Sequence, residues 1–250
     1  MTPSLPPLIA GNWKMNGLQY QLSEAEAVAE ALAAVPSRAR VALCPPATLI
    51  ARMALQLMGS GIEVGAQDLH PEASGAFTGD ISADMLADAG ARLVIIGHSE
   101  RRALHGEDDA LVARKVEAAL NGGIEPIICV GETLEERKGG RAEAVVCGQL
   151  AGSLPAALEG RRFSVAYEPV WAIGTGLTPT SEEIAAMHAA IRAALVGRFG
   201  ESARKAQILY GGSVKPANAA EILALPEVGG ALVGGASLKA ADFLPIVRAV

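Results

Sequence analysis

Eight short apolar runs, rich in β-branched residues, alternate along the chain with longer segments of helical periodicity. The runs span residues 8–12, 40–44, 62–66, 92–96, 125–130, 163–167, 207–210 and 230–233, and clear helical patterns include 23–34, 110–120, 181–196 and 217–225. Strands that are apolar along their whole length are typical of a parallel sheet, because such a sheet is buried on both faces. The alternation therefore predicts an α/β fold with eight parallel strands closed into a (β/α)8 barrel.

The length of 250 residues suits such a barrel as a single domain, 1–250. An open doubly wound sheet is the alternative fold, but its G-x-G-x-x-G turn does not follow the first run, where Gly11, Asn12, Trp13 and Lys14 stand. No linker, charge block or low-complexity segment divides the chain. We therefore expect no second domain.

Composition and charge exclude several classes of partner. A net charge of −6 and an aromatic content of 4% give no basic stripe or stacking platform, so no nucleic-acid partner is expected. No apolar run approaches the ~18 residues of a membrane span, and no signal sequence opens the chain. Cys44, Cys129 and Cys147 are far apart and the four histidines are unclustered, which favours a cytoplasmic, reducing location and argues against a metal site.

The segment from Tyr167 to Gly176 places one carboxylate, Glu168, where the sixth strand should end. Pro169 fixes its own φ and restricts the residue before it, so Glu168 should be held in place. The bulky apolar stretch behind it ends in two glycines and has the form of a mobile lid. The segment by itself is equally compatible with an ordinary strand-to-helix loop that carries a solvated glutamate.

Other polar residues also follow predicted strands, at the barrel end where active sites are built. Lys14 follows the first strand and His98 the fourth, where a helix start would disfavour a positive charge on the imidazole. Taken singly, each has a plain alternative, a solvated lysine and a structural histidine. Glycine pairs at 211–212 and 234–235 follow the last two strands. One such pair is more often a tight turn, but two on consecutive final strands predict a phosphate site.

Six segments, in order over nearly the whole chain, resemble the signature of the triosephosphate isomerase family. They are 11–16, 97–102, 129–132, 167–176, 210–214 and 233–238, beginning Gly-Asn-Trp-Lys and Gly-His-Ser-Glu in the first two. The resemblance implies the TIM barrel and a homodimeric enzyme of glycolysis and gluconeogenesis. Such an enzyme interconverts dihydroxyacetone phosphate and D-glyceraldehyde 3-phosphate through an enediolate, without a metal or organic cofactor.

The resemblance also implies roles for individual residues. Glu168 would be the base, His98 the neutral electrophile and Lys14 the electrostatic stabiliser. The implied substrate-binding residues are Asn12, Lys14, Gly174, Ser213, Gly234 and Gly235, with Glu100 supporting the lysine and the histidine. Thr78, on the loop 67–82, would approach Asn12 and Lys14 of the partner subunit. Asp68 departs from the family pattern, because many relatives carry Asn there.

Two other functions are compatible with parts of this pattern. Another phosphate-binding barrel enzyme, a Schiff-base aldolase or an epimerase, would use the same glycine turns, but the aldolase needs a nucleophilic lysine inside the barrel. A non-catalytic barrel would be expected to have lost a catalytic residue, and none is lost here. The pair Glu168 and His98 therefore favours the isomerase.

Overall fold

The computed structural model describes residues 5–173 and 177–250 and forms a closed parallel barrel in which each strand pairs with its sequence neighbours. The strands are β1 (Leu8–Asn12), β2 (Arg40–Cys44), β3 (Glu63–Ala66), β4 (Leu93–Ile96), β5 (Glu125–Val130), β6 (Ser164–Tyr167), β7 (Gln207–Tyr210) and β8 (Gly230–Val233). β1 pairs with both β2 and β8, which closes the barrel. The predicted fold is confirmed, although strands 3, 4 and 6 begin one residue later than expected.

Alternation along the strands divides the apolar core into two layers. Alternate apolar strand residues, such as Leu8, Ala10 and Ala166, belong to a small cluster that fills the barrel interior. The intervening residues, such as Ile9 and Val165, pack outward into the larger cluster beneath the helices. Because side chains alternate between the faces of a strand, the interior set continues beyond Ala10 to Asn12 and beyond Ala166 to Glu168. The same alternation that fills the core therefore directs both polar residues into the barrel mouth.

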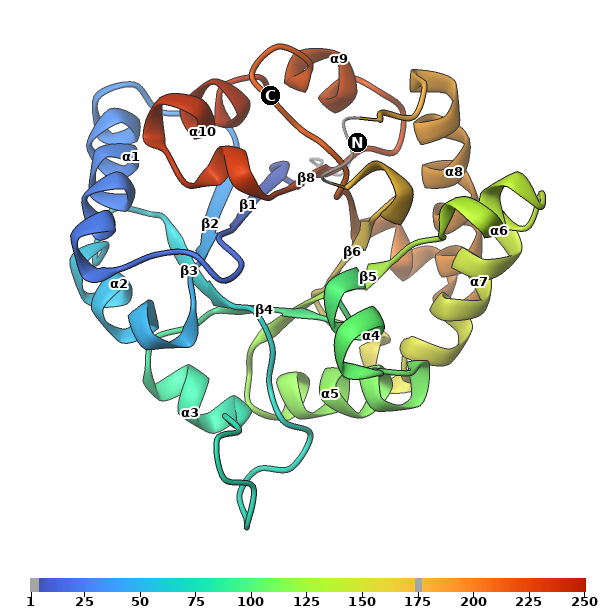
Figure 1. Cartoon of the computed structure of the whole chain (residues 1–250), viewed down its shortest axis with the longest axis horizontal. Coiled ribbons are helices and arrows are strands. Elements are labelled where there is room, and N and C mark those ends of the chain that lie inside the picture. Colours follow the sequence, from blue (N-terminus) through green and yellow to red (C-terminus); the bar gives the residue numbers. More distant parts are fainter. Residues whose placement is uncertain (1–4, 174–176) are drawn as a thin grey trace.

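Helices surround the barrel, and the chain runs once round the ring in sequence order (Figure 1). Capping residues start several of them, including a Thr180–Glu183 capping box at α8 and Asp108 at α5. The helices are α1 (Leu22–Ala34), α2 (Ile50–Gln56), α3 (Ala83–Asp88), α4 (Ser99–His105), α5 (Asp109–Asn121), α6 (Leu134–Lys138), α7 (Ala142–Ser153), α8 (Ser181–Phe199), α9 (Ala219–Leu223) and α10 (Ala240–Val247). No helix in the described ranges is long and apolar enough to cross a membrane.

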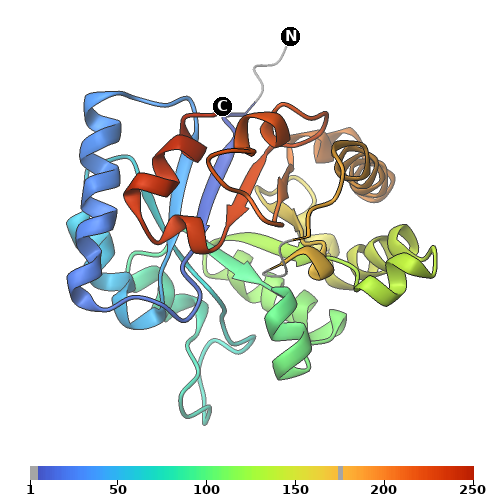
Figure 2. The same ribbon diagram turned by 45° about the horizontal axis from the view of Figure 1, so that its top comes forward.

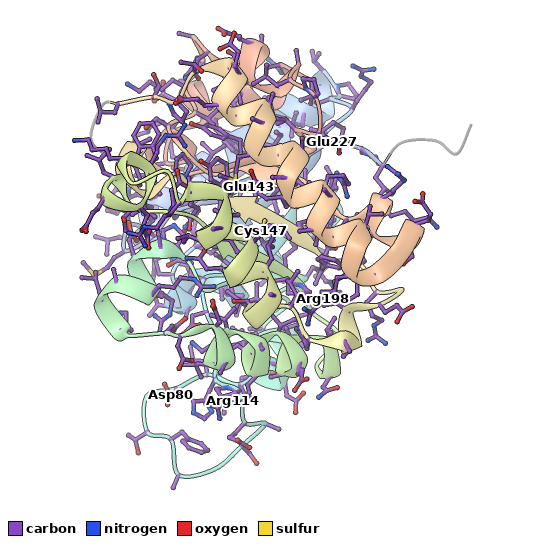
Figure 3. The ribbon with its side chains drawn as sticks, turned by 90° about the vertical axis from the view of Figure 1, so that its right-hand side faces the viewer. Asp80, Arg114, Glu143, Cys147, Arg198 and Glu227 are labelled. Carbon is purple, nitrogen blue, oxygen red and sulfur yellow. The ribbon has the colours of Figure 1, made fainter. Side chains whose placement is uncertain are left out.

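The segment between β3 and α3 extends away from the barrel as a long loop (Figure 2). The rings of His70 and Phe77 pack within it at a centroid distance of 4.0 Å. The backbone N–H of His70 donates to the Ile81 carbonyl at 2.8 Å. Figure 3 labels Asp80 on this loop near Arg114 of α5, and both line a cavity of about 390 Å³ at the loop's base. The loop is therefore structured by its own contacts although it projects from the body of the chain.

Candidate active site

A cavity of about 520 Å³ opens at the carboxyl ends of the strands, and we call it the mouth. Residues predicted from five different strand ends line it together, although they lie far apart in the sequence. They are Asn12, Lys14, His98, Glu168, Ser213, Gly234 and Gly235. Of the other predicted site residues, Glu100 lies beside the mouth and Thr78 on the projecting loop, while Gly174 lies outside the described residues.

Glu168 is 1% exposed and follows directly after β6. Its Oε2 accepts a hydrogen bond from the Ser99 N–H at 2.9 Å, and its Oε1 lies 2.8 Å from Nε2 of His98. Burial by itself would raise the pKa of Glu168, but His98, the Ser99 N–H and Lys14 outweigh it and hold the pKa below its ordinary value. Glu168 is therefore a carboxylate at neutral pH and able to accept a proton.

Two glycines leave the space that Glu168 occupies. A Cβ on Gly131, just beyond β5, would lie 1.7 Å from the Glu168 carbonyl oxygen, and one on Gly211 would lie 2.9 Å from its Cγ. Gly211 therefore makes room for the base, in addition to any part in a phosphate site. Sequence reasoning assigned no role to Gly131, since nothing local signals that two distant backbones touch there.

His98 precedes α4, and its ring caps that helix. The ring Nδ1 accepts a hydrogen bond from the Glu100 N–H at 3.2 Å, which places the imidazole proton on Nε2, facing Glu168. Burial lowers the pKa of His98, but the Glu168 carboxylate more than offsets this and the pKa is raised from its ordinary value. The expected neutral ring is thus favoured by the Nδ1 hydrogen bond and opposed by the charge of Glu168.

Lys14 has a φ of 53°, a left-handed conformation that is uncommon for a residue with a side chain. Its N–H donates to Asn12 Oδ1 at 3.0 Å, and its carbonyl accepts from Gln67 Nε2 at 2.8 Å. These bonds hold the turn and direct the ammonium toward the mouth, where Nζ lies 2.5 Å from Glu100 Oε1. Glu100 Oε2 also lies 3.7 Å from the His98 ring, so Glu100 contacts both residues it was expected to support.

The glycine turns after β7 and β8 line one side of the mouth. A Cβ on Gly235 would meet nothing within 4 Å, and one on Gly234 would meet Lys14 at 3.6 Å, so this backbone is open to a ligand close to a cation. Gly212 has a second reason to be glycine, because a Cβ there would lie 2.2 Å from the Tyr210 hydroxyl. The Ser213 hydroxyl donates to the Ala172 carbonyl at 3.1 Å, which links this turn to the segment after Glu168.

The segment after Glu168 begins with Pro169 at φ −64° and a single 3₁₀ turn, Val170–Ala172. Glu132 anchors this turn. It belongs to the segment 129–132 that carries the family resemblance, which implied no role for it. The Val170 N–H donates to the Glu132 carbonyl at 3.1 Å, and Trp171 Nε1 donates to Glu132 Oε1 at 2.9 Å. Tyr167 and Arg137 bond to the same oxygen at 3.1 Å each. Glu132 is fully buried, so these donors satisfy an oxygen that solvent does not reach.

Two further polar features lie at the edge of the site. Asp68 does not point into the mouth, and its carboxylate pairs with Lys115 at 2.6 Å and Arg101 at 2.8 Å, at the base of the projecting loop. Thr78 is exposed on that loop and is not among the described residues that line the mouth.

Cys129 is fully buried in the barrel interior, where burial and Glu168 raise the pKa of its thiol well above the ordinary value, as expected for a packing residue.

The fold and the mouth together define an enzyme of the (β/α)8-barrel class, with its polar groups gathered at the carboxyl end of the barrel. The family model described as triosephosphate isomerase matches residues 7–250. The chain belongs to the triosephosphate isomerase family.

Individual relatives agree with this assignment. The triosephosphate isomerase of Caulobacter vibrioides is 63% identical over 244 residues, which covers 98% of this chain and 96% of that protein. The triosephosphate isomerase of Afipia carboxidovorans is 58% identical over 249 residues, covering 100% and 99%. The crystal structure of triosephosphate isomerase from Bartonella henselae superposes with a TM-score of 0.91 at 48% identity and covers 98% of both chains. Sequence and structure are therefore similar over the full length of these relatives.

Proposed function

We propose that this chain interconverts dihydroxyacetone phosphate and D-glyceraldehyde 3-phosphate, a step of glycolysis and gluconeogenesis, with Glu168 as the base. The observation that supports this most is the placement of the Glu168 carboxylate 2.8 Å from the His98 ring in the mouth, which Lys14 also lines. Abstraction of a proton next to a carbonyl needs a base, a donor to the carbonyl oxygen and a positive charge nearby. These three residues meet the three needs.

In this reaction one proton is taken from a carbon atom and returned to the neighbouring carbon atom. Glu168 takes the proton from the carbon next to the carbonyl, and the electron pair of that C–H bond forms the carbon–carbon double bond of the enediolate. The carbonyl oxygen gains the negative charge, where the Nε2–H of His98 donates to it and Lys14 stabilises it. The proton then returns to the neighbouring carbon. The hydroxyl proton on the other enediolate oxygen passes to the oxygen that carries the charge, so that a new carbonyl forms and the former carbonyl oxygen becomes a hydroxyl. For this, the carboxylate must leave the Ser99 N–H, and His98 must exchange Glu168 for the substrate oxygens.

The charge state of His98 depends on the groups around its ring. The Glu168 carboxylate is the main cause that raises the pKa of His98. Once Glu168 holds the substrate proton, the negative charge has moved to the enediolate oxygen, which faces the same Nε2–H. The groups that favour a neutral donor are therefore burial and Lys14, which lower the pKa of the ring, and the Glu100 N–H, which needs an unprotonated Nδ1 as acceptor.

The phosphate would bind at the turns of Ser213, Gly234 and Gly235, together with the N–H of Gly174. The support for this site is the open backbone at Gly235 and the nearness of Lys14 to Gly234. Ser213 donates to Ala172, so a phosphate that recruits the Ser213 hydroxyl competes directly with the segment that follows the base. Phosphate binding and movement of this segment are coupled by that shared hydroxyl.

The alternative barrel chemistry is less compatible with the interior. A Schiff-base enzyme needs a lysine inside the barrel, whereas none of the eight described strands contains a lysine, and the buried Lys115 lies on α5 paired with Asp68 and Glu107. The purified chain should convert D-glyceraldehyde 3-phosphate in a coupled assay that consumes dihydroxyacetone phosphate. Treatment with borohydride in the presence of substrate should leave this activity unchanged. Trapping of a covalent adduct without isomerase activity would contradict the proposal.

A homodimer, working in a reducing compartment such as the cytoplasm, completes the proposal. The dimer is supported by the projecting loop, whose Phe77 is 41% exposed, and by Met15, which follows Lys14 and is 95% exposed. An isologous contact would bring the loop tip, with Thr78, against the mouth of the partner subunit. The free thiols of Cys44, Cys129 and Cys147 are compatible with a reducing location.

Replacement of Thr78 by arginine tests the dimer. Thr78→Arg places a bulky charge at the proposed contact and should give a monomer whose activity falls by more than about tenfold. Light scattering measures the mass, and Ser74→Arg, on the same exposed loop, is the matched control for a new surface charge. A wild-type chain that is monomeric and fully active would contradict the dimer without affecting the assignment of the base.

A further inference from the structure

The backbone of Glu168 rests against one peptide unit, that of Gly131. The Glu168 N–H donates to the Val130 carbonyl at 2.8 Å as the last bond of the β5–β6 ladder. One residue further, a Cβ on Gly131 would lie 1.7 Å from the Glu168 carbonyl oxygen and 2.7 Å from its carbonyl carbon. These two segments therefore touch backbone to backbone at the point from which the base projects. A shift of Gly131 would shift Glu168.

Gln149 of α7 holds this peptide from the outside. Its Oε1 accepts from the Gly131 N–H at 2.7 Å, and its Nε2 donates to the Gly131 carbonyl at 3.0 Å. The side-chain amide thus replaces a neighbouring strand where the ladder has ended, and it satisfies both polar groups of one residue. Two bonds to one residue fix its orientation as well as its place, which a single bond does not.

The helix that carries Gln149 is itself firmly packed. α7, marked by Glu143 and Cys147 in Figure 3, lies against α8, from which Arg198 donates to the Ala151 carbonyl at 3.1 Å. Gln149 also lines a second cavity, of about 220 Å³, together with Glu168, Ser99 and Val170. Space is therefore available beside Glu168, and packing alone does not fix the base there.

The Glu168 carboxylate has to exchange the Ser99 N–H for a substrate carbon while its backbone stays in place, and the segment beyond Val170 has to move. We propose that Gln149 is a positioning residue for the base, which locks the Gly131 peptide and through it the Glu168 backbone at the geometry from which the carboxylate reaches the substrate. This inference rests on the proposed role of Glu168. A displacement of about 1 Å of a reacting group is enough to cost up to a hundredfold in rate.

Gln149→Met tests the inference, because methionine has a similar volume but makes neither hydrogen bond. The expected result is a fall in kcat of about tenfold to a hundredfold with KM within about twofold, since the phosphate turns lie on β7 and β8. The acidic limb of the pH profile of kcat/KM should also move to higher pH, because a looser Glu168 loses part of the Ser99 N–H contact that lowers its pKa. A purely structural glutamine would move neither kcat alone nor this limb.

Two further variants keep the test decisive. Gln56→Met, on the exposed end of α2, is the matched control and should have wild-type kinetics. Gln149→Glu keeps an acceptor for the Gly131 N–H, lacks the donor for its carbonyl and adds a negative charge near the base. It should lower kcat, and kcat provides the test if Gln149→Met does not fold, because the added charge by itself would move the acidic limb upward. Unchanged kcat in whichever of the two folds would overturn the inference.

A double-mutant cycle separates this inference from the assignment of the base. If Gln149 acts through Glu168, Gln149→Met should have almost no further effect on kcat in the Glu168→Gln background. An equal loss in both backgrounds would show that Gln149 acts elsewhere and would overturn the positioning role. Near-normal turnover of Glu168→Gln alone would instead contradict the proposed function.

Discussion

At the amino ends of the strands, Arg40 of β2 places its guanidinium between Glu63 of β3, with two bonds of 2.6 Å, and Glu125 of β5, at 2.8 Å. Arg162 reaches the other oxygen of Glu125 at 3.2 Å. At the carboxyl ends, Lys14 pairs with Glu100 and His98 with Glu168, and both pairs line or border a cavity of about 520 Å³. The two ends of the barrel hold similar side chains in different arrangements.

The difference lies in whether the pairs can be exchanged. The amino-end carboxylates bind a guanidinium whose fork matches their geometry, and Arg40 is only 11% exposed, so these bonds satisfy the charges and link β2, β3 and β5 across this end of the barrel. In the mouth, Glu168 and His98 are each other's hydrogen-bond partner, and this bond must break when a substrate enters. Fixed pairs contribute to stability and exchangeable pairs to chemistry, so variants at the two ends should have opposite effects.

The largest effect on activity is expected from Glu168→Gln. The amide still accepts from the Ser99 N–H but takes no proton from carbon, so kcat should fall by about 10²-fold or more. The free energy of unfolding should change by no more than about 1 kcal/mol. A coupled assay and urea unfolding measure the two quantities, with the exposed Glu117→Gln as control. Near-normal turnover would remove Glu168 from the mechanism.

Shortening the lid should have the next largest effect on activity. Deletion of residues 173–176 removes Ile173, which lines the mouth, and the proposed phosphate contact of Gly174. A closing lid that holds the reacting groups in place is worth about 10²-fold in kcat, and its contact strengthens as the enediolate forms, so kcat should fall more than KM rises. The enediolate should then lose phosphate, and release of methylglyoxal and phosphate measures this leak. Normal isomerisation without phosphate release would contradict the lid.

The sequence predicted the barrel and the members of the mouth because both depend on local patterns. Strand alternation places Asn12 and Glu168 in the interior set, and position after a strand places Lys14 and His98 at the same end. It did not predict Gln149, Gly131 or the part of Glu132, because their contacts join segments that no local pattern relates. The phosphate residues, the dimer and the single domain 1–250 stay predictions.

Arg40→Met should reverse the outcome expected for Glu168→Gln. Removal of one member of this partly buried ion-pair cluster leaves the carboxylates of Glu63 and Glu125 without their main partner, which costs about 2 kcal/mol of stability. The kcat of the folded protein should stay within about twofold of wild type, because the mouth lies at the other end of the barrel. Arg40→Lys keeps the charge but not the fork and should be intermediate. Lost activity with unchanged unfolding would break the division between the two ends.

A smaller, pH-dependent effect is expected from the second buried histidine, His188 of α8. It is fully buried, its Nδ1 lies 3.2 Å from the Glu227 carbonyl, and its Nε2 has no hydrogen-bond partner among the described residues. Its ring neighbours are those of Tyr167 and Tyr210, at centroid distances of 5.9 Å and 6.5 Å, and burial outweighs the opposing effect of the Glu227 carboxylate. Burial therefore lowers the pKa of His188 to about 4, whereas Glu168 raises that of His98.

The sign of the effect follows from which state binds the proton. Between about pH 4 and 6.5 the unfolded chain protonates His188 and the folded chain does not, so stability from this group is present above pH 6.5 and is lost as the pH falls toward 4. From pH 7 to pH 5 the loss should be about 2 kcal/mol per chain.

The contribution of His98 to the pH dependence of stability has the opposite sign, so the effect of His188 has to be isolated by mutation. Urea unfolding at both pH values, at one protein concentration, should show a weaker pH dependence in His188→Gln than in wild type, while the exposed His105→Gln should match wild type. An equal pH dependence in His188→Gln and wild type would mean that the folded chain accommodates the proton, and that a buried histidine without a carboxylate partner costs no more here than one in the mouth.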